Sequence, residues 1–346
     1  MATESKTTPD VGPEMADALR LAKLPPKTLK EVADKQRYHR NGDVVTYVVN
    51  QNINFTNECV NYCRFCSFRK DEGYFMGIEE VLRKVETASN QGATEVCIQG
   101  GLHSDLNLDF YLKLIDSIKD RFPDIHLHAF SPMEVFYAAR KSQVSVDEAL
   151  RKLKWHGLDS MPGTAAEILD DRIRAKICPE KLSTAEWIEV ITKAHKLGIP
   201  STATMMYGHM ETMKERIAHI LLIRKIQEET GGFSEFVLLP FLHMNNPLGL
   251  SYQRKDGVDD EVTHALARLL LDGFIDNIQT SWVKLGRTRA QRLLDWGVND
   301  LGGTLMGENI SRSAGSTEKE YMSPQEIEEI IIEAGKVPRR RTTLYE

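Results

Sequence analysis

The sequence predicts an α/β fold, a (β/α)8 barrel of the TIM type with N- and C-terminal helical extensions. Segments rich in β-branched and aromatic residues alternate along the chain with segments of helical periodicity. Eight strand-like segments begin near residues 44, 95, 125, 158, 201, 233, 277 and 298. No glycine-rich dinucleotide or P-loop fingerprint follows the first of them, which counts against an open doubly wound sheet. The chain has 346 residues, and such a barrel takes about 250 as one domain.

The first residues are expected to stand apart from this barrel. Residues 1–43 are predicted to form a tail and helical extension, and residues 44–346 to form the barrel domain with its C-terminal helix. Met1–Asp10 is polar and mixed in charge, which is typical of a disordered tail. Prolines and charged runs predict short helices over 13–21 and 26–39.

Each barrel element rests on a local pattern. The predicted strands are 44–55, 95–99, 125–130, 158–161, 201–206, 233–240, 277–282 and 298–301. The predicted helices are 77–91, 108–121, 145–155, 183–197, 212–229, 264–273, 287–296 and one that begins at 323. Serine followed by glutamate three residues later marks the helix starts at Ser145, Ser183 and Ser323.

Composition narrows the class of function. The net charge of −6 and a pI near 6.0 argue against a binder of nucleic-acid backbones. The charged runs Lys214–Arg216 and Arg339–Arg341 are interpreted as solvated surface. No apolar run reaches the roughly 18 residues that span a bilayer. Five cysteines, three of them clustered, do not form a disulfide framework, so we expect a reducing cytoplasm.

The cluster Cys59, Cys63 and Cys66 follows the first strand directly. Three thiolates at this spacing can hold three corners of an iron–sulfur cube and leave the fourth iron open. A structural zinc site would need four closed ligands, and Cys97 and Cys178 lie at no ligand spacing. A redox Cys-x-x-Cys pair would leave Cys59 unused. In a parallel barrel this loop lies at the mouth that carries the active site.

Cys-x3-Cys-x2-Cys in this place, with Phe65 before the last cysteine, resembles the radical S-adenosylmethionine (SAM) superfamily. The resemblance implies that the barrel is a radical SAM barrel and that Cys59, Cys63 and Cys66 hold a [4Fe–4S] cluster. It also implies that the open iron chelates SAM, the second cofactor, and that reduction releases a 5′-deoxyadenosyl radical.

Further positions are similar to superfamily motifs that bind SAM. Gly100 and Gly101 follow the second strand, where glycine lets backbone approach the SAM amino group closely. Thr164 and Glu167 follow the fourth strand, where a carboxylate can bind ribose hydroxyls. The simpler interpretations are a strand-to-loop turn and an acidic residue at a helix N-terminus.

A narrower resemblance covers about Asp43 to Tyr345. Its sequence runs are 54–57, 99–103, 160–169, 202–209, 230–236, 240–244, 300–315 and 341–345. They resemble enzymes of deazaflavin coenzyme and futalosine-route menaquinone biosynthesis, and most of all the transferase subunit (subunit 2, CofH type) of FO synthase. That family implies cleavage of the Cα–Cβ bond of L-tyrosine and transfer of the 4-hydroxybenzyl fragment to C5 of 5-amino-6-(D-ribitylamino)uracil.

The same resemblance implies two protein partners, a separate radical SAM subunit 1 of FO synthase and an electron donor such as ferredoxin or flavodoxin. No nucleic acid or membrane partner is expected. Two alternatives remain open. One is a related radical SAM enzyme of the futalosine route, and the other is a non-catalytic metal-binding module.

Polar residues at predicted strand ends are the candidates for substrate binding. They are His103, His128, Tyr207, His209, His243, Glu308, Asn309 and Arg312, with Ser131 and Asn245 beside them. Tyr207 and His209 rank first because they end the fifth strand. A histidine in such a place is more often a hydrogen-bonded structural residue than a ligand. Met205, Met206 and Met210 are expected to fill the core or the pocket.

Overall fold

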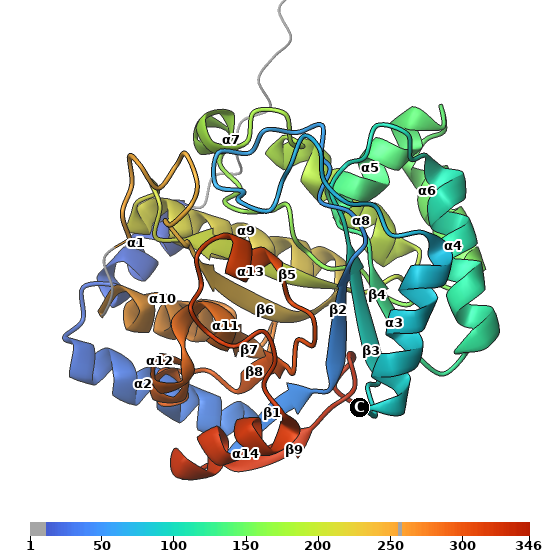
Figure 1. Ribbon diagram of the computed structural model, residues 1–346. Coiled ribbons are helices and arrows are strands. Elements are labelled where there is room, and N and C mark those ends of the chain that lie inside the picture. The colour runs from blue at the N-terminus through green and yellow to red at the C-terminus, as the bar shows by residue number, and fades with distance from the viewer. Residues whose placement is uncertain (1–11, 255–257) are drawn as a thin grey trace, which may run out of the picture.

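The computed structural model describes residues 12–254 and 258–346. The predicted disordered tail, Met1–Asp10, lies outside the described residues. Parallel strands surround a central axis and helices cover them from outside, as predicted (Figure 1). The proposed boundary between extension and barrel at residue 43 stays a prediction.

The regular strands form two sheets. One has the order β5-β6-β7-β8-β1-β9 and the other β2-β3-β4, and every pairing is parallel. The strands are β1 (Val44–Val48), β2 (Asn50–Asn54), β3 (Glu95–Gln99), β4 (His126–Ala129), β5 (Ser201–Tyr207), β6 (Phe233–Pro240), β7 (Ile278–Thr280), β8 (Asp300–Gly303) and β9 (Val337–Arg340).

Isolated parallel bridges join the two sheets at both edges. Ser160 pairs with His128 of β4, and the next residue, Met161, pairs with Ser201 of β5. On the other side, Gln51 of β2 pairs with Met306, which follows β8. The predicted strand 158–161 is thus reduced to two bridging residues, and it still occupies the fourth position of the ring.

The helices lie around the outside of the strands (Figure 1). They are α1 (Gly12–Leu21), α2 (Pro26–Asn41), α3 (Ile78–Asn90), α4 (Leu108–Arg121), α5 (Pro132–Lys141), α6 (Val146–His156), α7 (Asp171–Ile177), α8 (Thr184–Lys196), α9 (Met213–Thr230), α10 (Val258–Leu270), α11 (Trp282–Leu285), α12 (Arg287–Leu293), α13 (Ile310–Ser313) and α14 (Pro324–Glu333). The serine caps of α6, α8 and α14 form as predicted: Ser145, Ser183 and Ser323 each accept a hydrogen bond from the backbone N–H three residues on.

Several elements differ from the prediction. Helices α5, α7, α11 and α13 and strand β9 were not predicted, although α5 carries a recognisable capping box at Ser131 and Glu134. The predicted strand 277–282 ends at Thr280, since α11 begins at Trp282. The predicted strand 298–301 is shifted to β8, and α10 begins before the predicted 264.

A buried ionic network closes the end of the barrel where the strands begin. Arg341 donates from Nε to Asp300 Oδ2 (2.6 Å) and from Nη2 to Glu235 Oε2 (3.2 Å). Tyr345 donates its hydroxyl to the same Glu235 oxygen at 2.6 Å. Asp300 and Glu235 lie near the starts of β8 and β6, so the segment after β9 bridges strands that lie apart in sequence.

Thr343 extends this network to β3 by donating to Glu95 Oε2 at 2.7 Å. The interpretation of the Arg339–Arg341 run as surface is therefore wrong for Arg341, which is 5% exposed. Arg216 is likewise buried against Glu211 and Asp259, not solvated.

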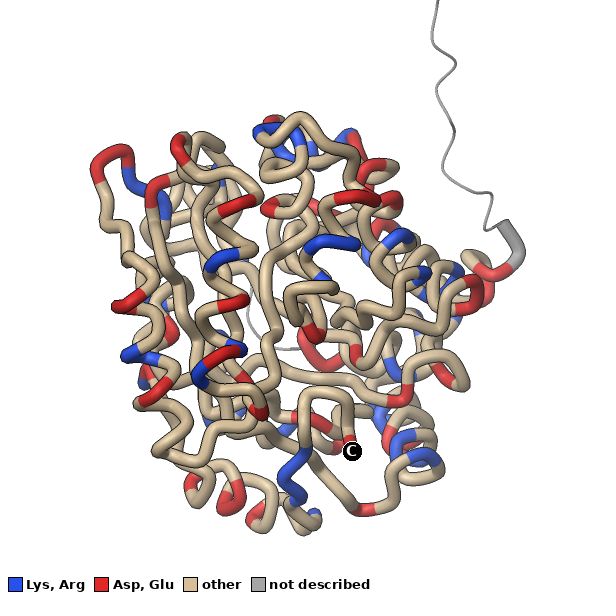
Figure 2. The backbone as a smooth tube through the Cα atoms, turned by 90° about the vertical axis from the view of Figure 1, so that its right-hand side faces the viewer, with Lys and Arg blue, Asp and Glu red and all other residues tan. Residues whose placement is uncertain are grey.

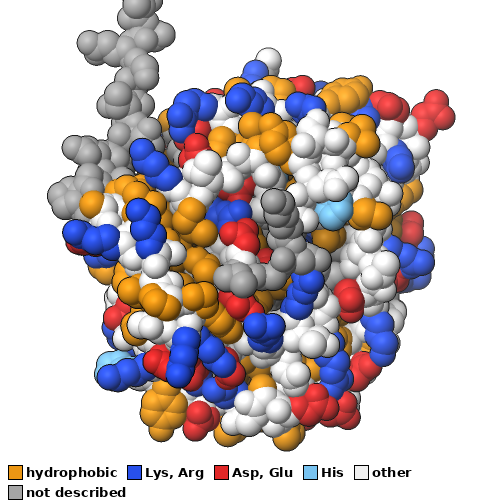
Figure 3. Space-filling model, turned by 90° about the vertical axis from the view of Figure 1, so that its left-hand side faces the viewer, with side chains coloured by type: hydrophobic (Ala, Val, Ile, Leu, Met, Phe, Trp, Pro, Cys, Tyr) orange, Lys and Arg blue, Asp and Glu red, His pale blue; other side chains and the backbone are white. Residues whose placement is uncertain are grey.

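The outer surface mixes both signs of charge. Figure 2 shows acidic and basic residues interspersed along the helices of one side. On the opposite side, where α1, α2 and α10 lie, hydrophobic side chains stand among charged ones (Figure 3). Among the described helices, none combines the length and the apolar character needed to cross a membrane.

Arg341→Met should lower the free energy of unfolding by about 3–5 kcal/mol, because it leaves buried carboxylates without their cation. Arg339→Met is the matched control, since Arg339 is an exposed residue of the adjoining strand β9. Urea unfolding followed by circular dichroism measures both variants. Equal midpoints for the two would contradict a stabilising role for the network.

Candidate active site

The cysteine loop and the glycine pair lie side by side because β2 and β3 pair in register. Asn54 ends β2 opposite Gln99, the last residue of β3, so the loops that follow leave the sheet together. Gly101 N–H donates to Thr56 O (2.9 Å), and Val60 N–H donates to Leu102 O (3.0 Å). These bonds join the two loops at the mouth of the barrel.

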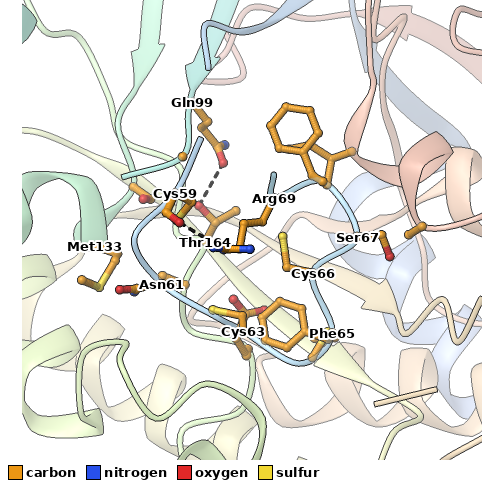
Figure 4. A pocket seen from close by; sticks show the side chains of 18 of the residues that line it. Cys59, Asn61, Cys63, Phe65, Cys66, Ser67, Arg69, Gln99, Met133 and Thr164 are labelled. Carbon is orange, nitrogen blue, oxygen red and sulfur yellow. Dashed lines mark hydrogen bonds between the residues drawn. The ribbon is translucent and has the colours of Figure 1, made fainter. Parts of the chain in front are cut away.

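Both loops line a cavity of about 260 Å³ at this mouth. Figure 4 shows the cysteines on one loop around it, with Gln99 and Thr164 joined by a hydrogen bond. The predicted residues that line it are Cys59, Cys63, Phe65, Cys66, Gly100, Gly101, Thr164 and Glu167. Ser131 and Met206 line it as well. The predicted cluster and cofactor positions therefore meet at one place.

Neighbouring segments hold the cysteine loop in position. Arg64 N–H donates to Ile177 O at 2.8 Å, and Leu248 N–H donates to Arg64 O at 2.9 Å. The side chain of Arg69 reaches back to the carbonyl oxygen of Cys59 at 3.1 Å. The loop is thus fixed by backbone contacts from α7 and from the segment after β6.

The cysteines fit an iron–sulfur cube better than a single ion. In residues 12–254 and 258–346, no group of three His, Cys, Asp or Glu side chains converges on one metal position. A cube needs no such convergence, because each thiolate binds a different iron. Cys59, Cys63 and Cys66 face a shared cavity, and all three are free of disulfides. Burial raises the pKa of the Cys63 thiol.

Steric contacts explain why glycine occupies positions 100 and 101. A Cβ atom on Gly101 would overlap the carbonyl oxygen of Glu58 and lie 3.0 Å from Cys59 Cβ. One on Gly100 would lie 2.5 Å from the Phe55 ring. Both glycines are therefore needed for the cysteine loop to pack against the end of β3.

Glu134, which the sequence reading missed, fixes the glycine loop from α5. Its carboxylate accepts from Gly100 N at 2.9 Å and from both the N–H and the hydroxyl of Ser131 at 2.7 Å. Burial raises its pKa to about 7, against the lowering effect of these hydrogen bonds. The sequence signal was present: Ser131-Pro132-Met133-Glu134 is a capping box with proline at the first helical position.

The segment that carries Thr164 and Glu167 is held in an unusual conformation. Ala165 and Glu167 have φ values of 65° and 47°, which side chains rarely adopt. Buried Arg174 of α7 offsets this strain by donating to Ala165 O (3.1 Å) and Ala166 O (2.5 Å). Trp187 adds a hydrogen bond from Nε1 to Thr164 O at 3.2 Å.

Glu167 is not a free carboxylate. Lys181 Nζ lies 2.5 Å from Glu167 Oε1, and both side chains are largely buried. Lys181 also lies 5.2 Å from the centre of the Phe65 ring, in a cation–π contact. This lysine, missed from sequence, puts a positive charge beside the cysteine loop. One oxygen of Glu167 remains for a ligand.

The first four predicted substrate residues do not line the cavity. His103 Nε2 lies 3.1 Å from Glu58 Oε2, beside the cysteine loop. His128 shares Ser160 Oγ with His126, each at 2.7 Å, and burial lowers the pKa of His128 to about 4. Tyr207 donates its hydroxyl to Asp260 of α10 at 2.7 Å.

His209 Nε2 lies 3.1 Å from the carbonyl oxygen of Met206, and its ring meets Phe241 of the cavity wall edge-on. His243 is half-buried in the segment after β6, where its backbone packs against Gly249. Both lie behind or beside the wall of the cavity.

The remaining three surround α13. Glu308 accepts from Ile310 N at 3.0 Å and Ser311 N at 2.9 Å. Asn309 is the N-cap residue of α13, and Arg312 is paired with Glu320 with 68% of its side chain exposed. None of the three lines the cavity.

Both halves of the chain match known families. Residues 53–223 match the radical SAM superfamily, and residues 230–346 match the CofH/MqnC C-terminal region. A 5-amino-6-(D-ribitylamino)uracil–L-tyrosine 4-hydroxyphenyl transferase of Methanosarcina barkeri is 57% identical over 334 residues, which are 95% of this chain and 89% of that protein. The transferase of Archaeoglobus fulgidus is 56% identical over 94% of both chains.

The chain belongs to this transferase family of the radical SAM superfamily.

It is therefore a radical SAM enzyme, and the interpretation as a non-catalytic metal-binding module is set aside. Solved structures agree on the fold. Methylornithine synthase superposes with a TM-score of 0.74 at 16% identity over 94% of both chains. The hydrogenase maturase HydG of Carboxydothermus hydrogenoformans superposes with a TM-score of 0.75 at 14% identity over 96% of this chain and 77% of its own. These neighbours confirm the radical SAM barrel.

Gly101→Ala should displace the cysteine loop, since the added Cβ has no space beside Glu58 and Cys59. We expect iron and sulfide content after anaerobic reconstitution to fall to less than about half of the wild-type value, as expected when a ligand loop moves away from its cluster. Gly77→Ala is the control, because a Cβ there meets nothing within 4 Å. Full iron content in Gly101→Ala would contradict the packing argument.

Lys181→Met should destabilise the fold by about 3–5 kcal/mol, because it leaves Glu167 buried without its cation. Adding Glu167→Gln should recover much of this loss, since removing both charges avoids an unpaired one. Urea unfolding of the two single variants and the double variant gives the coupling energy. Additive effects would show that the ion pair does not act as a unit.

Proposed function

We propose that this chain transfers the 4-hydroxybenzyl group of L-tyrosine to 5-amino-6-(D-ribitylamino)uracil, on the route to FO. The observation that carries the proposal is the high identity to transferases with this name across both the cluster half and the C-terminal half. The C-terminal half matters because it supplies the cavity wall formed by Leu239–Leu242, Lys284, Ile310 and Ala314.

Cys59, Cys63 and Cys66 would hold a [4Fe–4S] cluster in this proposal. With SAM bound, the reduced cluster would supply a 5′-deoxyadenosyl radical, which is the chemistry needed to remove a hydrogen atom from bound tyrosine. After loss of a hydrogen atom from the tyrosine amine, the Cα–Cβ bond would break homolytically to give a glycine-derived imine and a 4-hydroxybenzyl radical. That radical would add to C5 of the uracil by opening the C5–C6 double bond, and the adduct would return one electron to the oxidised cluster and lose one proton. The protein has to align the two substrates and keep water from the radicals.

The residues of the chain divide these tasks. The backbone of Gly100 and Gly101 offers a close approach for the SAM amino group, held in place by Glu134. Thr164 and the oxygen of Glu167 not bound by Lys181 would bind the ribose hydroxyls, since both residues line the cavity. Phe65 lies against Lys181, the partner of Glu167.

Three of the eight strand-end candidates would act from behind this surface. His209 supports Phe241, and Glu308 fixes the start of α13. His103 supports Glu58 at the foot of the cysteine loop. We keep His128, Tyr207, His243, Asn309 and Arg312 as candidates for contacts that form when substrates are bound.

The partners follow from the reaction. The product is open, so a second radical SAM protein, FO synthase subunit 1, would close the ring. A low-potential carrier such as ferredoxin or flavodoxin would supply the electron. Five free cysteines suit a reducing cytoplasm.

Anaerobic incubation of the reduced holoenzyme with SAM, L-tyrosine and the diaminouracil tests the proposal. We expect 5′-deoxyadenosine and a hydroxybenzyl–uracil adduct by mass spectrometry, and we expect Cys63→Ala to form neither, because it removes a cluster ligand. Cys97→Ala is the control, since Cys97 lies within β3 and does not line the cavity. Radical formation that requires a futalosine derivative in place of tyrosine would overturn the proposal in favour of the menaquinone-route relative.

A further inference from the structure

The cavity has two unlike walls. One wall is made by the cysteine loop, the end of β3 and the segments that carry Glu134, Glu167 and Lys181, and its charged side chains are Arg69, Glu134, Glu167 and Lys181. The facing residues come from the later strands and include Met206, Leu239–Leu242, Ile310 and Ala314. Among the described residues of this second wall, Lys284 alone carries a charge.

Lys284 stands on α11, directly after β7, and its ammonium group has spare hydrogen-bonding capacity. Nζ donates to Ser311 Oγ of α13 at 3.0 Å. An ammonium has three donors, and within the described chain the structure gives Lys284 no carboxylate within 4.0 Å. The carboxylate with the largest charge effect on Lys284 is Glu308, and it already accepts hydrogen bonds from two backbone N–H groups.

A buried ammonium group costs desolvation free energy unless an anion pairs with it. Burial lowers the pKa of Lys284. The negative charges of Glu308 and Glu167 raise it, but they do not cancel the effect of burial. The protein neighbours of Lys284 thus favour a negatively charged group at Nζ. The ligand that completes the site must bring a carboxylate-like anion together with an apolar body that fits the facing wall.

We infer that Lys284, oriented by Ser311, binds the carboxylate of the amino-acid substrate, with the aromatic ring lying along the apolar wall. This rests on the proposed function, in which that substrate is L-tyrosine. The aminouracil fits the wall less well, since its ribityl chain is neutral and rich in hydroxyls. SAM belongs to the opposite wall, beside the cysteines and the glycine pair.

Equilibrium dialysis of the anaerobic holoenzyme with SAM tests this inference, using L-tyrosine and tyramine, which lacks the carboxylate. Wild-type enzyme should bind tyrosine about 10- to 100-fold more tightly than tyramine, the range expected for hydrogen bonds between charged groups. Lys284→Met should lose that preference by weakening tyrosine binding alone, and Lys284→Arg should retain part of it. Lys176→Met, at an exposed position of α7, should behave as wild type.

Iron content and circular dichroism show whether each variant folds and loads its cluster. If Lys284→Met does not load, Ser311→Ala decides, because it keeps the lysine and removes its orienting partner. An unchanged tyrosine-to-tyramine ratio in a loaded variant would overturn the inference. A wild-type enzyme that prefers tyrosine yet forms no adduct would overturn the proposed function and leave this carboxylate site in place.

Discussion

The in-register pairing of β2 with β3 is the contact on which the site depends. It sets the end of one strand level with the end of the next, so that the loops after Asn54 and Gln99 meet edge to edge. The absence of a side chain at Gly101 lets them meet at backbone distance. An iron–sulfur cube is rigid, and its ligands must be presented from a fixed frame. Here the frame is the sheet itself, extended by two loops that brace each other.

Charge organises the remaining parts of the mouth. Arg174 holds a strained segment through carbonyl oxygens alone, whereas Lys181 is matched to a carboxylate. Among the described residues, Lys284 donates a hydrogen bond only to the hydroxyl of Ser311. These three cations therefore differ in how far the protein's own groups satisfy their hydrogen bonds and their charge. The less a buried cation is satisfied by protein, the more its position indicates where a ligand belongs.

Much of the fold and the cluster loop could be predicted because their signals lie in short stretches of sequence. Strand composition, serine caps and the spacing of three cysteines each involve residues close in sequence. The cations Lys181 and Lys284 could not be found this way, since both acquire their role from tertiary contacts, Lys181 with Glu167 and Lys284 with Ser311. The helix that carries Glu134 does have a local signal, the capping box formed by Ser131 and Glu134.

The burial of Arg341 could not be predicted from its local sequence either. In sequence it ends a run of three arginines, and the first two are exposed on β9. Its partners lie on β6 and β8, over forty residues away, so no local pattern separates it from its neighbours.

That ionic network also bears on the order in which the chain can fold during synthesis. Glu95, Glu235 and Asp300 emerge from the ribosome before Arg341, Thr343 and Tyr345, the partners that follow β9. Until Arg341 is available, burial of these carboxylates is unfavourable, so that end of the strands stays hydrated. The barrel can therefore assemble its strands early, and its base can exclude water only after Arg341 has been synthesised.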